Sequence, residues 1–209
     1  MNRKNTLAIF AAAAVAGFGL AGPAAHARQG TMKTPPVNNT VSPVDKMFIM
    51  AATQGNMAEI MTSQLALKKT QNKDVRMIAE MLIKDHGKAL EDLKPVARSA
   101  RVMMPKKPNS EQRAMYAMLS RKSGRAFDKA YMAGQVKAHL ETIGLFQKEN
   151  RTGRDKEATN YAATYLPGIQ SHTSMIVETA KTVGVPLSMA ARQYEKNKMG
   201  AMKMDHGAK

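Results

Sequence analysis

The pattern of apolar and polar positions along the chain is that of long amphipathic helices. Apolar residues recur three and four positions apart through residues 72–100, at Val75, Ile78, Leu82, Ala89, Leu93 and Val96. The same spacing marks residues 155–183, at Ala158, Tyr161, Tyr165, Ile169, Ile176, Thr179 and Val183. Such spacing places side chains on one face of an α-helix. No stretch shows the alternation typical of a strand, so the sequence predicts an all-α protein.

Capping residues predict where the first helices begin. Ser42, followed by Pro43 and Asp45, is a helix start with a capping box, and the helix continues to about residue 70. Asn72 begins a second helix that runs to about residue 100. Pro95 lies inside that helix and predicts a kink or an early end.

Further signals divide the second half of the chain. Asn109 predicts a short helix as far as about residue 119, and a third long helix follows over 125–150. Thr152 and Asp155 together predict the start of a fourth long helix. That helix ends near residue 183, where Gly184 is suited to the left-handed conformation.

The order of these helices predicts two antiparallel hairpins joined by a long crossover, the arrangement of a ferritin-like four-helix bundle. A simple up-and-down bundle with short loops would not need the long connection over 101–124. We therefore expect the bundle over 44–184 and a basic, Met-rich tail, helical or disordered, over 185–209.

The N-terminal segment resembles a secretory signal peptide. Arg3 and Lys4 precede an apolar stretch over 7–21, and the small residues Ala25 and Ala27 suit cleavage after Ala27. Residues 28–43 are rich in Pro and polar side chains, which predicts a disordered linker. We expect a periplasmic or secreted protein that does not span a membrane after cleavage, because no later apolar stretch is long enough.

Composition narrows the chemistry and the partners. The chain has no Cys, which excludes disulfides, zinc fingers and thiol nucleophiles, and its formal charge is +16. For an exported protein, this charge points to an anionic envelope surface (lipid, lipopolysaccharide or cell wall) and not to nucleic acid. The alternative is a charged surface that serves only solubility.

Polar residues interrupt the apolar faces at similar depths. His86 and His172 each occupy a gap in the apolar stripe of their helix, and His139 points inward on the third long helix. Glu59 lies at a comparable depth on the first helix, and Asp85 adjoins His86. At about 1.5 Å per residue, these levels differ by less than roughly 10 Å.

One carboxylate and three imidazoles from four helices are a plausible metal site. Imidazole with carboxylate suits Fe, Cu, Zn or Mn, and Asp85 is either a further ligand or a partner that orients an imidazole. The alternative is a hydrogen-bonded polar core that has a structural role and binds no metal. Glu59 lies at the edge of its apolar stripe, so exposure to solvent is a second interpretation of that residue.

The chain resembles the DUF4142 family over residues 45–184. The resemblance depends on the order and spacing of Phe48, Gly55, Glu59, Asp85, His86, Phe127, Asp128, Tyr131, His139, Leu166, Pro167 and His172. It implies an exported bacterial bundle of ferritin-like fold, without a settled biochemical role. Glu59, Asp85, His86, Asp128, His139 and His172 match its polar marker positions.

The sequence departs from di-iron ferritins in one important respect. Those proteins need Glu-x-x-His on two helices, whereas Ile83 and Ile169 stand three residues before His86 and His172. We expect no enzymatic activity, since no base is placed beside a nucleophile either. The tail, with Met199, Met202, Met204 and His206, has soft donors that suit Cu(I), although chance spacing is the simpler explanation in a chain this rich in Met.

Overall fold

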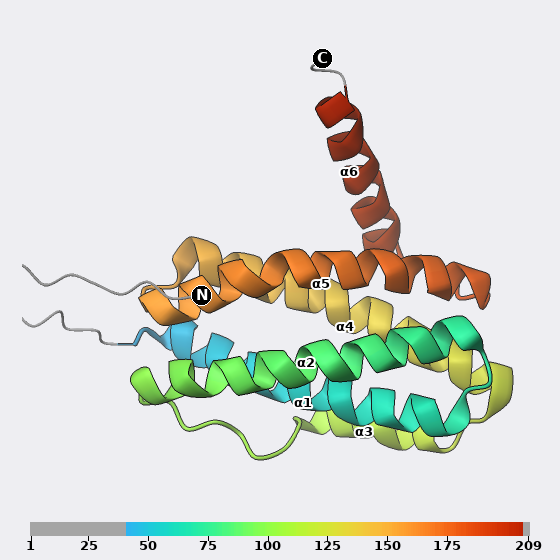
Figure 1. Cartoon of the computed structure of the whole chain (residues 1–209), viewed down its shortest axis with the longest axis horizontal. Coiled ribbons are helices and arrows are strands. Elements are labelled where there is room, and N and C mark those ends of the chain that lie inside the picture. The colour runs from blue at the N-terminus through green and yellow to red at the C-terminus, as the bar shows by residue number, and fades with distance from the viewer. Residues whose placement is uncertain (1–40, 207–209) are drawn as a thin grey trace, which may run out of the picture. The chain divides into compact units, whose positions relative to one another are not determined.

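The computed structural model describes residues 41–206, with side chains through Met199. Figure 1 shows its helices. They are α1 (Pro43–Lys69), α2 (Lys73–Ser99), α3 (Ser110–Ser120), α4 (Gly124–Thr152), α5 (Lys156–Thr182) and α6 (Met189–His206). The described residues contain no strand, so the all-α class is confirmed. The predicted signal peptide and residues 28–40 of the predicted linker lie outside the described residues.

The four long helices pack as two hairpins. α1 packs along α2 and α4 packs along α5, and the hairpins meet through α1 against α4 and α2 against α5. The crossover carries α3, which lies against α1 and α4. The helical hairpins and the long crossover follow the prediction, and the ferritin-like assignment of this arrangement stays a prediction.

The predicted caps form as expected with one exception. Ser42 and Asp45 make a reciprocal capping box, and Asn72 accepts from the backbone of its first turn. The prediction for Thr152 was wrong, because Thr152 ends α4 and its hydroxyl donates to the Lys148 carbonyl. Asp155 alone caps α5, where its side chain accepts from the Ala158 amide.

Two helices end in the same hydrogen-bonded motif. After α2, Arg101 adopts φ 53°, and the Val102 amide donates to the Ala97 carbonyl. After α5, Gly184 adopts φ 81°, and the Val185 amide donates to the Ala180 carbonyl. Both are Schellman ends. Pro95 does not shorten its helix, since α2 continues through Ser99.

A polar layer divides the interior into two apolar clusters. One contains Leu65, Leu82, Val136 and Ile176, and the other contains Phe48, Leu93, Phe146 and Tyr161. On every long helix the chain passes from one cluster to the other through buried polar side chains. These are Asn56 and Glu59 on α1, His86 on α2, Gln135 and His139 on α4, and His172 on α5.

The C-terminal helix contacts the bundle through its first turns. Ala191 is fully buried in an apolar cluster, and the Tyr194 hydroxyl donates to the Gln170 carbonyl. Met199 is exposed, and the side chains of Met202, Met204 and His206 lie outside the described residues. Within the described chain, no helix combines the length and apolar character that crossing a membrane requires.

Candidate metal centre

Three imidazoles from three helices meet in the polar layer. The ring centroids lie 5.6 Å apart for His86 and His139, 5.8 Å for His86 and His172, and 5.9 Å for His139 and His172. One ring nitrogen from each residue lies within 4.8 Å of the other two. The sequence placed these side chains on inward faces at similar depths, and the structure brings them together.

A chain of hydrogen bonds determines the protonation of the His86 ring. Tyr161 donates its hydroxyl proton to the Ala89 carbonyl at 3.0 Å, so its oxygen accepts from Asn56 Nδ2 at 3.3 Å. The amide orientation then directs Asn56 Oδ1 to His86 Nδ1 at 2.8 Å. An amide oxygen only accepts, so Nδ1 of His86 carries the proton and Nε2 holds a lone pair.

The other two rings are each held through one nitrogen as well. His139 Nδ1 lies 3.1 Å from the Gln135 carbonyl oxygen and donates to it. His172 Nε2 lies 3.0 Å from Asp85 Oδ2. In both rings the second nitrogen is therefore the one available to accept or to coordinate.

The second nitrogen of every ring is buried and unpartnered. His86 Nε2, His139 Nε2 and His172 Nδ1 have no hydrogen-bond partner among the described residues. Buried polar atoms are normally paired, so three such atoms in one layer require an explanation. In metal sites, a ligating His donates its other N–H to a carboxylate, a carbonyl or a similar acceptor, which is the pattern found here.

Burial keeps the His86 and His139 rings uncharged at neutral pH. Burial lowers the pKa of His86 well below its usual value, with further lowering by repulsion from His139 and His172. Burial lowers the pKa of His139 to about 3, with repulsion from His172 acting in the same direction. Neutral rings have the free lone pair that a metal ion requires.

The two carboxylates predicted for the site lie differently. Asp85 contacts His172, and its side chain is 45% exposed. Glu59 is buried, which excludes the solvent-exposed interpretation, and its Oε1 lies 3.9 Å from His139 Nδ1. That nitrogen already bonds to the Gln135 carbonyl, so Glu59 does not join the three converging nitrogens. Burial raises the pKa of Glu59 to about 7, against a hydrogen bond with Gln135 that lowers it.

Two further polar residues belong to this description. Asn56 was missed by the sequence analysis, although its place one turn before Glu59 on a buried face was a usable signal. Asp128 is buried near the start of α4 and is not a member of the His group. The sequence alone does not predict which way the carboxylate and amide side chains near the three rings point.

A small cavity adjoins the His cluster. Its volume is about 180 Å³, and its polar lining includes His86, His172, Asp85 and Glu59. Tyr161 and Phe146 form part of its apolar wall. Since the Asp85 side chain is partly exposed, this cavity offers a short route from solvent to the rings.

A comparison with protein families found one that matches most of the chain. The model for a domain of unknown function, DUF4142, matches residues 30–207. The chain belongs to the DUF4142 family. This assignment confirms the resemblance seen in the sequence.

A solved structure shows the same kind of fold. It is a DUF305 protein from Streptomyces coelicolor that is described as secreted, with a TM-score of 0.60 and 10% sequence identity to the DUF4142 chain. The alignment covers 69% of this chain and 95% of the other. At this identity the likeness concerns the helical fold alone. A comparison with curated proteins gave no match.

Proposed function

We propose that this DUF4142 protein binds one first-row transition-metal ion through His86, His139 and His172. The observation that supports the proposal is that the two nitrogen atoms of each ring have different surroundings. One nitrogen donates to a protein acceptor, and the other is buried without a partner among the described residues. A structural polar core would instead be expected to pair those nitrogens with each other or with nearby donors.

The donor set limits the choice of metal. Three imidazole ligands suit Zn, Cu, Fe or Ni, and affinity among divalent ions peaks at Cu(II). Metal–nitrogen bonds of about 2.0–2.1 Å require nitrogen atoms closer than the present 4.8 Å limit, so binding draws the rings together. Three protein ligands leave a further coordination position for water or another small ligand.

Asn56, the Gln135 carbonyl and Asp85 have the orienting role in this proposal. Each holds the far nitrogen of one ring and thereby directs the other nitrogen inward. Glu59 is left out of the ligand set because it approaches His139 from the nitrogen that is already bonded. The adjoining cavity is the entry route for the ion.

We also infer that the protein acts outside the cytoplasm. The N-terminal sequence has the features of a signal peptide, and the DUF305 neighbour is described as secreted. A metal-binding role in the envelope combines these features, whereas the absence of Glu-x-x-His pairs argues against di-iron chemistry.

Titration of tag-free protein with Zn(II), Cu(II) and Co(II) tests the proposal. We expect one tightly bound equivalent, with Co(II) giving the absorption spectrum of a nitrogen-ligated site. His139→Gln should weaken binding at least about 100-fold, while His206→Gln in the tail should leave the first equivalent unchanged. Circular dichroism verifies that both variants are folded.

Two results would overturn the proposal. Equal stoichiometry and affinity in wild type and His139→Gln would show that the rings do not ligate. Loss of binding only in His206→Gln would move the metal to the tail. In either case the buried imidazoles would be a structural polar core.

A further inference from the structure

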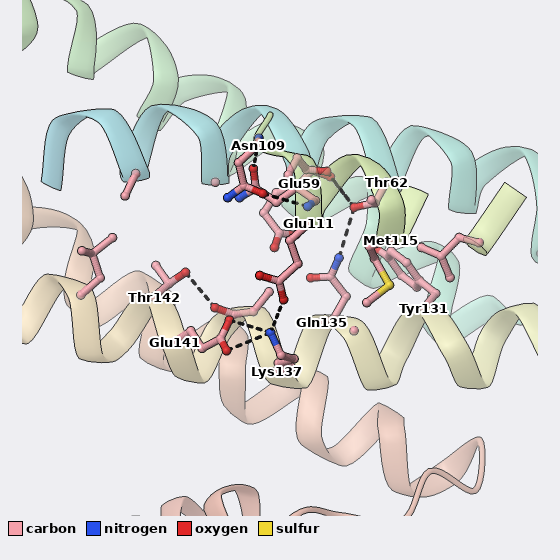
Figure 2. A pocket seen from close by; sticks show the side chains of 18 residues that line it. Glu59, Thr62, Asn109, Glu111, Met115, Tyr131, Gln135, Lys137, Glu141 and Thr142 are labelled. Carbon is pink, nitrogen blue, oxygen red and sulfur yellow. Dashed lines mark hydrogen bonds and ion pairs between the residues drawn. The ribbon is translucent and has the colours of Figure 1, made fainter. Parts of the chain in front are cut away.

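A second, larger cavity lies on the other side of Glu59. Its volume is about 310 Å³, and it is enclosed by α1, α3 and α4. Figure 2 shows this pocket, with the side chains of Glu59, Gln135 and Thr62 in its interior. It takes in none of the three His residues, although Glu59 lines both this cavity and the one beside the His cluster.

Small residues explain why space remains between these helices. α1 contributes Ala51, Gly55 and Ala58 to the wall, and α4 contributes Gly134 and Ala138. A Cβ atom added at Gly55 would meet nothing within 4 Å, so the cavity is open at that point. The packing of α3 over the gap, with Met115 near Gly134, covers the cavity without filling it.

Two residues that line this cavity, Glu59 and Gln135, each carry a buried hydrogen-bond acceptor. Glu59 Oε2 and Gln135 Oε1 are buried and have no partner among the described residues. Gln135 uses its Nε2 toward the Thr62 hydroxyl, 3.5 Å away, as the dashed line in Figure 2 indicates. A ligand that satisfies Gln135 Oε1 and the ionised form of Glu59 must donate hydrogen bonds.

The residues that line the cavity carry a net negative charge, whereas the chain as a whole is positively charged. Lys and Arg outnumber Asp and Glu by 32 to 16 overall. The cavity lining instead contains Glu59, Glu111 and Glu141 against the single cation Lys137. Lys137 is bound to the two outer carboxylates, each at 2.9 Å, which leaves Glu59 without a cation.

We propose that this cavity binds a small organic molecule with a primary ammonium group and a short apolar body. The ammonium would donate to Glu59 Oε2 and Gln135 Oε1, and the apolar body would lie against Met115, Leu119 and Leu145. A hard metal ion fits less well, because Ca²⁺ takes six to eight oxygen ligands and only two free acceptors are buried here. A volume of about 310 Å³ is at the small end of ligand pockets.

Calorimetric titration with benzylamine and benzyl alcohol tests the inference. The two probes have nearly the same shape and differ in charge. We expect benzylamine to bind at least about tenfold more tightly than the alcohol, since the ammonium makes charge-assisted hydrogen bonds. EDTA is present throughout, so that an amine coordinated to metal at the His cluster cannot produce the signal.

Three variants test which residues the probes need. Glu59→Gln keeps the size of the side chain and should remove the preference for the amine, whereas Glu141→Gln at the exposed rim should retain most of it. Gly55→Leu extends a side chain into open space and should block both probes while the protein stays folded.

The inference fails if the amine and the alcohol bind equally, if neither binds, or if Glu59→Gln binds the amine as wild type does. Tight binding of Ca²⁺ or Na⁺ that depends on Glu59 would also overturn it in favour of an inorganic cation. None of these outcomes bears on metal binding by His86, His139 and His172, so failure here and failure of the proposed function are distinguishable.

Discussion

Asp85 Oδ2 lies 3.0 Å from His172 Nε2, and the two residues come from facing helices, α2 and α5. The contact leaves His172 Nδ1 as the nitrogen directed at the other two rings, without a partner among the described residues. Asp85 is therefore connected to the three-His cluster through one ring, and it also lines the cavity that leads there.

Asp85→Ala should weaken metal binding about 10- to 100-fold, the usual effect of removing a residue that orients a ligand. The ring of His172 would lose its only carboxylate partner and would rotate more freely. Isothermal titration with Zn(II) measures the change. Glu91→Ala, at an exposed position on the same helix that pairs with Lys94, is the matched control and should bind as wild type does.

Asn56→Leu should destabilise the protein by about 1–3 kcal/mol, because it leaves the buried Nδ1–H of His86 unpaired. Metal affinity should also fall, since the protonated nitrogen of the ring is no longer fixed. Tyr161→Phe keeps Asn56 beside His86 and should cost less than Asn56→Leu. Urea unfolding of metal-free protein gives both values, and an equal loss in the two variants would contradict this explanation.

Glu149 should make the bundle less stable at alkaline pH. It is buried near Asp45 and Asp155, where burial and then the contact with Asp45 raise its pKa to about 8. A group whose pKa is raised by folding contributes its stability below the unfolded value and loses it as pH rises through the folded value. The stability that Glu149 contributes should therefore decline as the pH rises from 4.5, its ordinary pKa, to about 8, its pKa in the folded protein.

Melting temperatures of wild type and Glu149→Gln across this range isolate the effect from other titrating groups. The variant should be the more stable protein at pH values above about 8, and its advantage should shrink toward acid pH. Glu157→Gln, exposed in the first turn of α5, is the control. A constant difference between wild type and Glu149→Gln at every pH would refute the assignment.

Both Schellman ends favour glycine, so introducing it at Arg101 and removing it at Gly184 should have opposite effects on stability. Arg101 has φ 53°, a conformation that costs a non-glycine residue about 1–2 kcal/mol, so Arg101→Gly should stabilise the protein by up to about 1 kcal/mol. Gly184→Ala should destabilise it by about 1 kcal/mol, since its φ is 81° and a Cβ there approaches the Lys129 side chain at 3.3 Å. Chemical denaturation measures both, and the same sign for the two substitutions would count against the motif.

The basic composition predicts binding to anionic surfaces. The formal charge of +16 decreases by only two if the N-terminal segment with Arg3 and Lys4 is removed. Co-sedimentation with vesicles that contain anionic lipid should show binding that weakens as salt increases toward about 0.5 M, because exposed charges are screened. Neutral vesicles are the control, and binding that does not respond to salt would argue against an electrostatic association.

The positions and faces of the helices could be predicted from the sequence because both depend on local interactions. Caps such as Ser42 and Asp155 involve residues within one turn, and three- and four-residue periodicity places His86 and His172 on the buried side. Thr152 was predicted wrongly as a cap because a Thr hydroxyl can either cap the helix that follows or donate to a carbonyl of the helix that contains it. The order and spacing of the residues that resemble the DUF4142 family also predicted its family, which the family match confirms.

Contacts between helices were decided only by the tertiary structure. Whether three inward rings meet depends on the rotation and axial offset of α2, α4 and α5, which periodicity leaves free by several ångströms. The pairing of Asn56 with His86, the burial of Glu59 and the cavity beneath α3 depend on those offsets as well. The sequence by itself determined which polar side chains face inward, and tertiary packing decided which nitrogen atoms converge and which acceptors remain free.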